Sequence, residues 1–242
     1  MTHAAAWSDR MRLLRHSARA ARQLLLRPSI APRQCNICGY AGAFYPVGTP
    51  PRLDAGCPAC NSLERHRLLK LWADENLAQL QGRTILHFAP ERAVGSFIAP
   101  LAAKYITADI DARNVDHQVN IEDIAFAEGF CDVILCSHVL EHVDDRKALA
   151  ELYRILRSGG LLLMMTPVNW AWDKTYENPA ISSERDRLLH FGQNDHVRYF
   201  GADIVSRIET AGFRVALVRS LEPAVSRHGL LRSDVLFLCS KE

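Results

Sequence analysis

Four cysteines in the first quarter of the chain have the spacing of a metal site. They form two Cys-x-x-Cys pairs, Cys35 with Cys38 and Cys57 with Cys60, separated by 18 residues. Each pair places two thiolates on one turn, and two such turns supply the tetrahedral set of sulfur ligands that Zn²⁺ prefers. Disulfides are rare inside cells, and a redox motif needs only one pair. We therefore predict a structural zinc ribbon over residues 33–61, because so short a segment cannot build a core of its own.

A second group of side chains suited to metal binding or proton transfer lies near the middle of the chain. His138, Glu141 and His142 form the string His-x-x-Glu-His, and His196 lies further on. Positions i, i+3 and i+4 share one face of a helical turn, so the first three can converge on a divalent ion such as Mg²⁺. A bound ion lowers the pKa of a hydroxyl, and a neutral histidine can act as general base. The string also matches a zinc-protease motif, and Glu141 and His142 could instead cap the next helix.

The elements that must position these residues alternate between strand and helix from Arg83 onward. A helix is expected over 62–80 before them. The later helices are expected at 92–103, 144–157 and 201–211, and the strands at 83–88, 105–109, 118–121, 131–137, 161–166, 213–219 and 233–240. This alternation predicts an α/β fold with a Rossmann-like, doubly wound, seven-stranded sheet. Ligands of such sheets bind outside the carboxyl ends of the strands, where His138 follows the fourth strand.

The rest of the chain completes the predicted organisation. Residues 1–32 read as a basic amphipathic helix, since residues 1–34 carry a net charge of +6 and the remainder carries −4. This helix could meet RNA, an anionic surface or an acidic partner, or simply be solvated. Residues 62–242 form the Rossmann-like domain, with 167–200 as a substrate insert or lid. No apolar run could span a bilayer and no signal peptide is recognisable, so a cytoplasmic location is expected.

Residues 83–167 resemble class I S-adenosylmethionine-dependent methyltransferases, especially the branch that contains ubiquinone-biosynthesis O-methyltransferases. The resemblance is most specific over residues 130–160, FCDVILCSHVLEHVDDRKALAELYRILRSGG, which are similar to the family's fourth strand, the helix after it and the Gly-Gly turn into the fifth strand. The resemblance implies that Asp109, at the end of the second strand, holds the ribose hydroxyls of the cofactor, with Asp111 as the alternative. A carboxylate can accept both hydrogen bonds.

The resemblance implies a wider set of cofactor-binding residues at the strand ends. They are His87, Ala89, Glu91, Asp109, Asn120, Ile121 and Ser137. The loop after the first strand departs from the family pattern, which usually has an acid followed by Gly-x-Gly. Here Ala89 stands where the backbone must approach the cofactor closely, and Glu91 could receive the methionine amino group.

Together these observations predict an S-adenosylmethionine-dependent O-methyltransferase that acts on a hydroxyl of a small molecule or saccharide. His142, His196 and Glu141 are the expected catalytic residues, and with His138 they form a candidate Mg²⁺ site, as in some members of the branch. The alternative is an RNA methyltransferase that docks RNA through the zinc ribbon and the basic N-terminus. Two observations argue against RNA, whose phosphate backbone needs positive charge. Residues 35–60 contain one basic residue, Arg52, and the catalytic part is acidic. A non-catalytic binding module is a third class, and the oligomeric state is not predicted.

Overall fold

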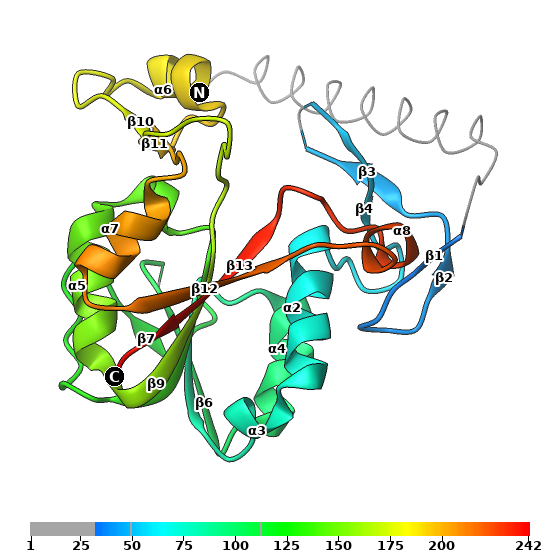
Figure 1. Ribbon diagram of the computed structural model, residues 1–242, viewed down its shortest axis with the longest axis horizontal. Coiled ribbons are helices and arrows are strands. Elements are labelled where there is room, and N and C mark those ends of the chain that lie inside the picture. Colours follow the sequence, from blue (N-terminus) through cyan, green and yellow to red (C-terminus); the bar gives the residue numbers. More distant parts are fainter. Residues whose placement is uncertain (1–31, 49, 112) are drawn as a thin grey trace.

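A seven-stranded mixed sheet forms the centre of the molecule (Figure 1). The computed structural model describes residues 32–48, 50–111 and 113–242, so the predicted N-terminal helix lies outside the described residues. The strand order is β12-β13-β9-β8-β5-β6-β7. The strands are β5 (Thr84–Phe88), β6 (Lys104–Asp109), β7 (His117–Gln118), β8 (Cys131–Ser137), β9 (Leu156–Met165), β12 (Arg214–Arg219) and β13 (Val235–Ser240). The predicted doubly wound, seven-stranded Rossmann-like sheet is confirmed.

The order of the strands fixes where a ligand can bind. Strands β5 to β9 run parallel, whereas β13 pairs antiparallel with both β9 and β12. The chain moves outward from β5 through β6 to β7 and then returns to β8 on the other side of β5. The adjacent β5 and β8 are therefore the topological switch point, and a crevice opens outside their carboxyl ends.

Helices cover both faces of the sheet. On one face lie α5 (Asp145–Ile155) and α7 (Ile204–Thr210), and on the other lie α2 (Glu64–Glu75), α3 (Leu77–Leu80) and α4 (Arg92–Ile98) (Figure 1). Each face has its own apolar core. The run Cys131–Ser137 supplies side chains to both cores, which is why β8 reads as continuously apolar rather than alternating. Among the described residues, no helix has the length and apolar character needed to cross a bilayer.

Several predicted boundaries are shifted for local reasons. The helix expected over 92–103 ends at Ile98 and continues as the 3₁₀ turn η1 (Ala99–Leu101), because Pro100 cannot donate a helical hydrogen bond. The helix expected over 62–80 is divided at Asn76 into α2 and α3. The expected helix to residue 157 ends at Ile155, and the expected Gly-Gly turn lies inside β9.

The segment 167–200, predicted as a substrate insert or lid, contains short strands and a helix. It contains β10 (Tyr176–Glu177), β11 (Arg198–Tyr199) and α6 (Glu184–Phe191), and β10 pairs antiparallel with β11. The buried Arg198 donates to the Leu140 carbonyl at 2.8 Å, and the backbone N of Val197 donates to the Glu141 carbonyl at 2.9 Å. These bonds fix the end of the insert beside the turn that follows β8.

Residues 33–61, called the cysteine module below, form two small hairpins. One pairs β1 (Arg33–Gln34) with β2 (Ala41–Gly42), and the other pairs β3 (Tyr45–Val47) with β4 (Arg52–Gly56). The module lies against α2 and α8 (Ala224–His228) (Figure 1).

One buried side chain joins the cysteine module to the rest of the molecule. The Arg67 guanidinium, 0% exposed, donates to four carbonyl oxygens at 2.6–2.8 Å, those of Ala55, Ser62, His228 and Gly229. A buried charge is costly without such partners, so these bonds fix the position of the module.

Candidate active site

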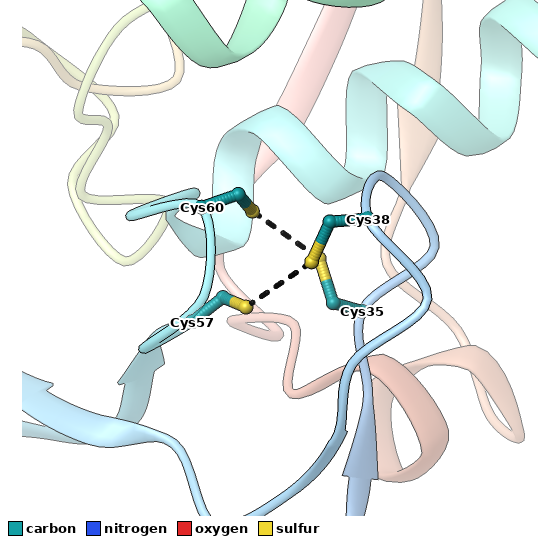
Figure 2. A group of neighbouring side chains, drawn as sticks. All are labelled: Cys35, Cys38, Cys57 and Cys60. Carbon is teal, nitrogen blue, oxygen red and sulfur yellow. Dashed lines mark hydrogen bonds between the residues drawn. The ribbon is translucent and has the colours of Figure 1, made fainter.

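The four cysteines of the module form a compact sulfur cluster. Figure 2 shows Cys35 and Cys38 facing Cys57 and Cys60 from two separate turns. The Sγ atoms of Cys35 and Cys60 are 3.7 Å apart and those of Cys38 and Cys57 are 3.6 Å apart, and all four lie within 4.8 Å of one another. A disulfide would need about 2.05 Å. A tetrahedral Zn²⁺ with Zn–S bonds of about 2.3 Å has an S–S edge of roughly 3.8 Å. The donor set and its spacing therefore fit zinc.

The two cysteine turns share one backbone design. In each, the N–H four residues after the first cysteine donates to that cysteine's carbonyl, from Gly39 at 2.9 Å and from Asn61 at 2.8 Å. Both donors have left-handed backbone, with φ of 80° and 57°. Glycine and asparagine are the residues that tolerate this conformation best, so the sequence prepares both turns for four sulfurs.

A cavity of about 500 Å³, called the strand-end cavity below, lies at the switch point of the sheet. Of the predicted cofactor-binding residues, four line it: Ala89, Asp109, Asn120 and Ile121. The apolar Phe88 and Val119 and the histidines His138 and His142 line it too. A carboxylate beside apolar side chains suits a nucleoside, with the ribose on the acid and the base on the apolar side chains.

The other predicted cofactor residues do not line this cavity. His87 is buried and its Nδ1 lies 2.6 Å from the Tyr105 hydroxyl; burial lowers the pKa of His87 to about 4, so it is neutral. Ser137 ends β8 outside the lining. The alternative acid Asp111 is exposed, and Arg113 donates to its carboxylate at 2.9 Å.

Glu91 is also turned away from the strand-end cavity. Its carboxylate pairs with Arg65 and lies 2.8 Å from His66 Nε2. Burial alone would raise the pKa of Glu91, but His66 and Arg65 outweigh it and lower the pKa to about 2. The carboxylate is thus ionised and already paired, which makes it a structural link between α2 and the loop after β5.

Two residues in left-handed backbone flank the switch point. Ala89, directly after β5, has φ 47°, and His138, directly after β8, has φ 56°. The Ala89 conformation is the one that a glycine of the family loop would adopt freely. An L-residue there costs roughly 1–2 kcal/mol, and such strain concentrates at functional sites.

The predicted histidine and glutamate residues come together at the edge of the strand-end cavity. Glu141 is 2% exposed; its Oε2 accepts from the Thr166 hydroxyl at 2.9 Å, and its Oε1 lies 3.2 Å from His138 Nδ1. The rings of His142 and His196 meet edge to face with centroids 4.6 Å apart. Glu141, His142 and His196 each offer one ligand atom within 4.8 Å of the others.

The electrostatics of this cluster define its protonation. Burial alone would raise the pKa of Glu141, but the hydrogen bond and charge of His138 outweigh burial. The net effect is a lowered pKa, so the carboxylate is ionised. Burial lowers the pKa of His196, which is therefore neutral at pH 7. His142 Nδ1 lies 3.4 Å from the Asp195 carboxylate, which can hold the ring in one orientation. His196 Nδ1 is buried without a hydrogen-bond partner, and the buried Glu141 Oε1 has only the His138 contact at 3.2 Å.

Helix capping does not account for these residues. Asp144 is the N-cap of α5, and its carboxylate accepts from the backbone N of Arg146 and Lys147 at 3.1 and 3.3 Å. Glu141 and His142 lie in the separate 3₁₀ turn η2 (Leu140–His142). They remain available for chemistry.

A second cavity of about 460 Å³, the module cavity below, shares His138 and His142 with the first. Its walls come from segments far apart in the sequence: Val47, Arg52, Leu63, Glu64, Arg65, Glu141, Thr166, Pro167, Val168, Gln193, His196, Leu231, Ser233 and Asp234. The sequence gives no periodic signal for this set. The two histidines therefore lie where the two cavities adjoin.

Comparisons with known proteins agree with this geometry. Residues 81–164 match the family model described as a methyltransferase domain. A curated relative from Mycolicibacterium smegmatis, named "Probable S-adenosylmethionine-dependent methyltransferase", is 28% identical over 148 residues, which cover 55% of this chain and 53% of the relative. The chain thus matches about half the length of that relative.

Solved structures share the fold at low sequence identity. YcgJ from Bacillus subtilis has a TM-score of 0.51 and 15% identity, covering 73% of this chain and 99% of that one. An S-adenosylmethionine-dependent methyltransferase from Mesorhizobium loti has a TM-score of 0.51 and 10% identity, covering 71% and 97%. These likenesses support the Rossmann-like methyltransferase fold and leave the ubiquinone-biosynthesis branch a prediction.

Proposed function

We propose that this protein is an S-adenosylmethionine-dependent O-methyltransferase whose acceptor is a small molecule or saccharide in the cytoplasm. The observation that carries the proposal is the position of His142 between the strand-end cavity and the module cavity. One cavity has the lining of a nucleoside site and the other is polar. A group between them can act on an acceptor atom that faces a cofactor.

The strand-end cavity would hold S-adenosylmethionine, which supplies an electrophilic methyl group when bound. Asp109 would accept hydrogen bonds from the ribose hydroxyls, while Ala89 leaves room for close backbone approach. Asn120 and Ile121 would contact the adenine. The insert contributes Arg187 and Asp195 to the same cavity, which supports its role as a lid.

In this proposal His142 takes the proton of the acceptor hydroxyl. Asp195 orients its ring, and the neutral His196 and ionised Glu141 stabilise the imidazolium that forms. Alternatively, Glu141, His142 and His196 would together hold a divalent ion, and since two of these three ligands are imidazoles, the set suits Mn²⁺ better than Mg²⁺, which prefers oxygen. Such an ion would lower the pKa of the acceptor hydroxyl.

The cysteine module would hold one structural zinc. All four sulfurs are used as ligands, so the ion has no open position for catalysis. RNA remains the alternative acceptor. The module cavity gives it little support, since three carboxylates line that cavity and a phosphate backbone needs cations.

The test of the proposal is His142→Ala assayed with radiolabelled S-adenosylmethionine against a library of hydroxylated small molecules and saccharides. Loss of a general base should lower the rate about 10²–10⁴-fold with unchanged cofactor affinity. His117→Ala, on the exposed strand β7, is the matched control and should keep full activity.

A second assay, on the unmodified protein, distinguishes metal-dependent catalysis from catalysis by His142 alone. If the cluster holds a divalent ion, EDTA stops turnover and Mn²⁺ or Mg²⁺ restores it while the zinc stays bound; if His142 acts alone, EDTA has no effect. Full activity of both His142→Ala and His196→Ala would refute the assignment of the cluster to catalysis.

A further inference from the structure

The module cavity is built jointly by the cysteine module and the methyltransferase fold. Val47 and Arg52 come from the β3–β4 hairpin, Glu64 from the first turn of α2, and Asp234 from the loop between α8 and β13. The histidine cluster lines the same cavity. Neither part of the molecule encloses this space without the other.

Buried polar contacts hold the two parts in a fixed relation. Arg52 Nε donates to the Glu64 carboxylate at 2.8 Å, and Glu64 is 4% exposed. His228 Nδ1 lies 2.7 Å from the Gln34 carbonyl, and Arg67 adds its four carbonyl bonds. These contacts fix the position of the wall that the module supplies.

Asp234 differs from the other charged groups of this cavity. Arg52 pairs with Glu64, and Arg65 pairs with Glu91. The Asp234 carboxylate has neither an ion-pair nor a hydrogen-bond partner among the residues that the structure describes. Burial, followed by the charge of Glu64, raises its pKa to about 6. At pH 7 it is mainly an ionised acceptor that lacks donors.

The chemistry of the cavity selects the class of ligand. A partly buried carboxylate without donors is stabilised by ligand groups that donate hydrogen bonds, which hydroxyl groups do. Asp234 would repel a phosphate or carboxylate ligand. Neither Arg52 nor Arg65 is free to offset this repulsion, since each is already paired with a carboxylate. The volume of about 460 Å³ lies in the range of small-molecule sites.

We propose that the cysteine module forms one wall of the acceptor site and that Asp234 selects a neutral, hydroxyl-rich acceptor by accepting hydrogen bonds from it. Val47 and the Arg52–Glu64 pair shape the wall around that acceptor. The inference rests on the proposed methyltransferase function and gives the cysteine module a role in specificity beyond metal-supported folding.

The first experiment measures ligand binding to the zinc-loaded protein saturated with S-adenosylhomocysteine. The probes are the methyl glycosides of glucose, galactose and mannose, with glucose 6-phosphate as the anionic comparison, detected by saturation-transfer NMR and titrated for affinity. At least one neutral glycoside should bind, and the phosphate ester should bind more weakly. Asp234→Asn should weaken the glycoside about tenfold without changing S-adenosylmethionine affinity. Asp74→Asn, an exposed acid of α2 outside both cavities, should change nothing.

The second experiment tests the wall of the module. Val47→Trp should fill the cavity and abolish glycoside binding, while Ala41→Trp, on the exposed side of the other hairpin, should preserve it. Thermal unfolding and cofactor titration of both variants serve as the test that each one folds.

Three results would overturn the inference while leaving the proposed function intact. They are cofactor binding without any glycoside binding, unchanged glycoside affinity in Asp234→Asn, and preferred binding of the phosphate ester. A wild-type protein that binds no S-adenosylmethionine would instead overturn the proposed function, and this inference with it.

Discussion

Replacing Ala89 by glycine should stabilise the protein, which is opposite to the usual effect of this substitution. Ala89 has φ 47°, a conformation that costs an L-residue roughly 1–2 kcal/mol and glycine almost nothing. Glycine loses about 0.4–1 kcal/mol through the greater entropy of the unfolded chain. The net gain is about 0.5–1 kcal/mol, or a rise in Tm of roughly 1–4 °C for a chain of this size.

The matched control is Ala150→Gly, on the exposed face of α5. In an ordinary helical position the same substitution should destabilise by about 1 kcal/mol. Chemical denaturation of both variants beside the wild type measures the difference. Equal destabilisation by the two substitutions would refute the left-handed conformation at Ala89. It would also remove the argument that this loop keeps the backbone path of a glycine-rich loop.

Three further predictions concern the metal, the cofactor and acid stability. Freshly purified protein should contain about one zinc per chain, and Cys57→Ser should lose both the metal and solubility; metal analysis that finds no zinc would reject the site. Asp109→Ala should weaken S-adenosylmethionine binding tenfold or more, because hydrogen bonds to a charged group contribute about 1.5–3 kcal/mol; calorimetry giving an unchanged Kd would reject the ribose contact. The pKa of Glu91 falls from 4.5 to about 2 on folding, so its stabilisation is complete above pH 4.5 and is lost as pH falls toward 2. Glu91→Gln should therefore flatten the acid limb of the stability–pH curve, and an unchanged limb would show that another carboxyl controls it.

The parts of the molecule that follow from local pattern were predictable. The run Cys131–Ser137 is apolar on both faces and so predicts a central strand, and the Cys-x-x-Cys spacing predicts the sulfur cluster directly. The family resemblance indicated Asp109 and Ala89, and parallel strands bring their carboxyl ends to one edge, as that assignment requires. The strand and the sulfur cluster could be predicted because a few residues close together in the sequence are sufficient to indicate each of them.

The module cavity and the insert could not be predicted in this way. Arg52, Glu64 and Asp234 come together because the module docks against the C-terminal half through Arg67 and His228, and these contacts have no local periodicity. The strands β10 and β11 have two residues each and depend on a partner some 20 residues away, so neither carries an alternating pattern. The pairing of Glu91 with His66 and Arg65 was missed for the same reason, since the partners belong to α2.

The four carbonyl bonds of Arg67 have a consequence for synthesis of the chain. Two acceptors, Ala55 and Ser62, are made close to Arg67, but His228 and Gly229 are made 161 and 162 residues later. Domains generally fold from the N-terminus as the chain emerges, so the cysteine module can form long before its partner segment exists. The loop that carries Asp234 emerges later still. A nascent chain can therefore complete its four-sulfur cluster while its second cavity is still open, and a ribosome stalled before residue 228 would leave Arg67 with two of its four carbonyl bonds.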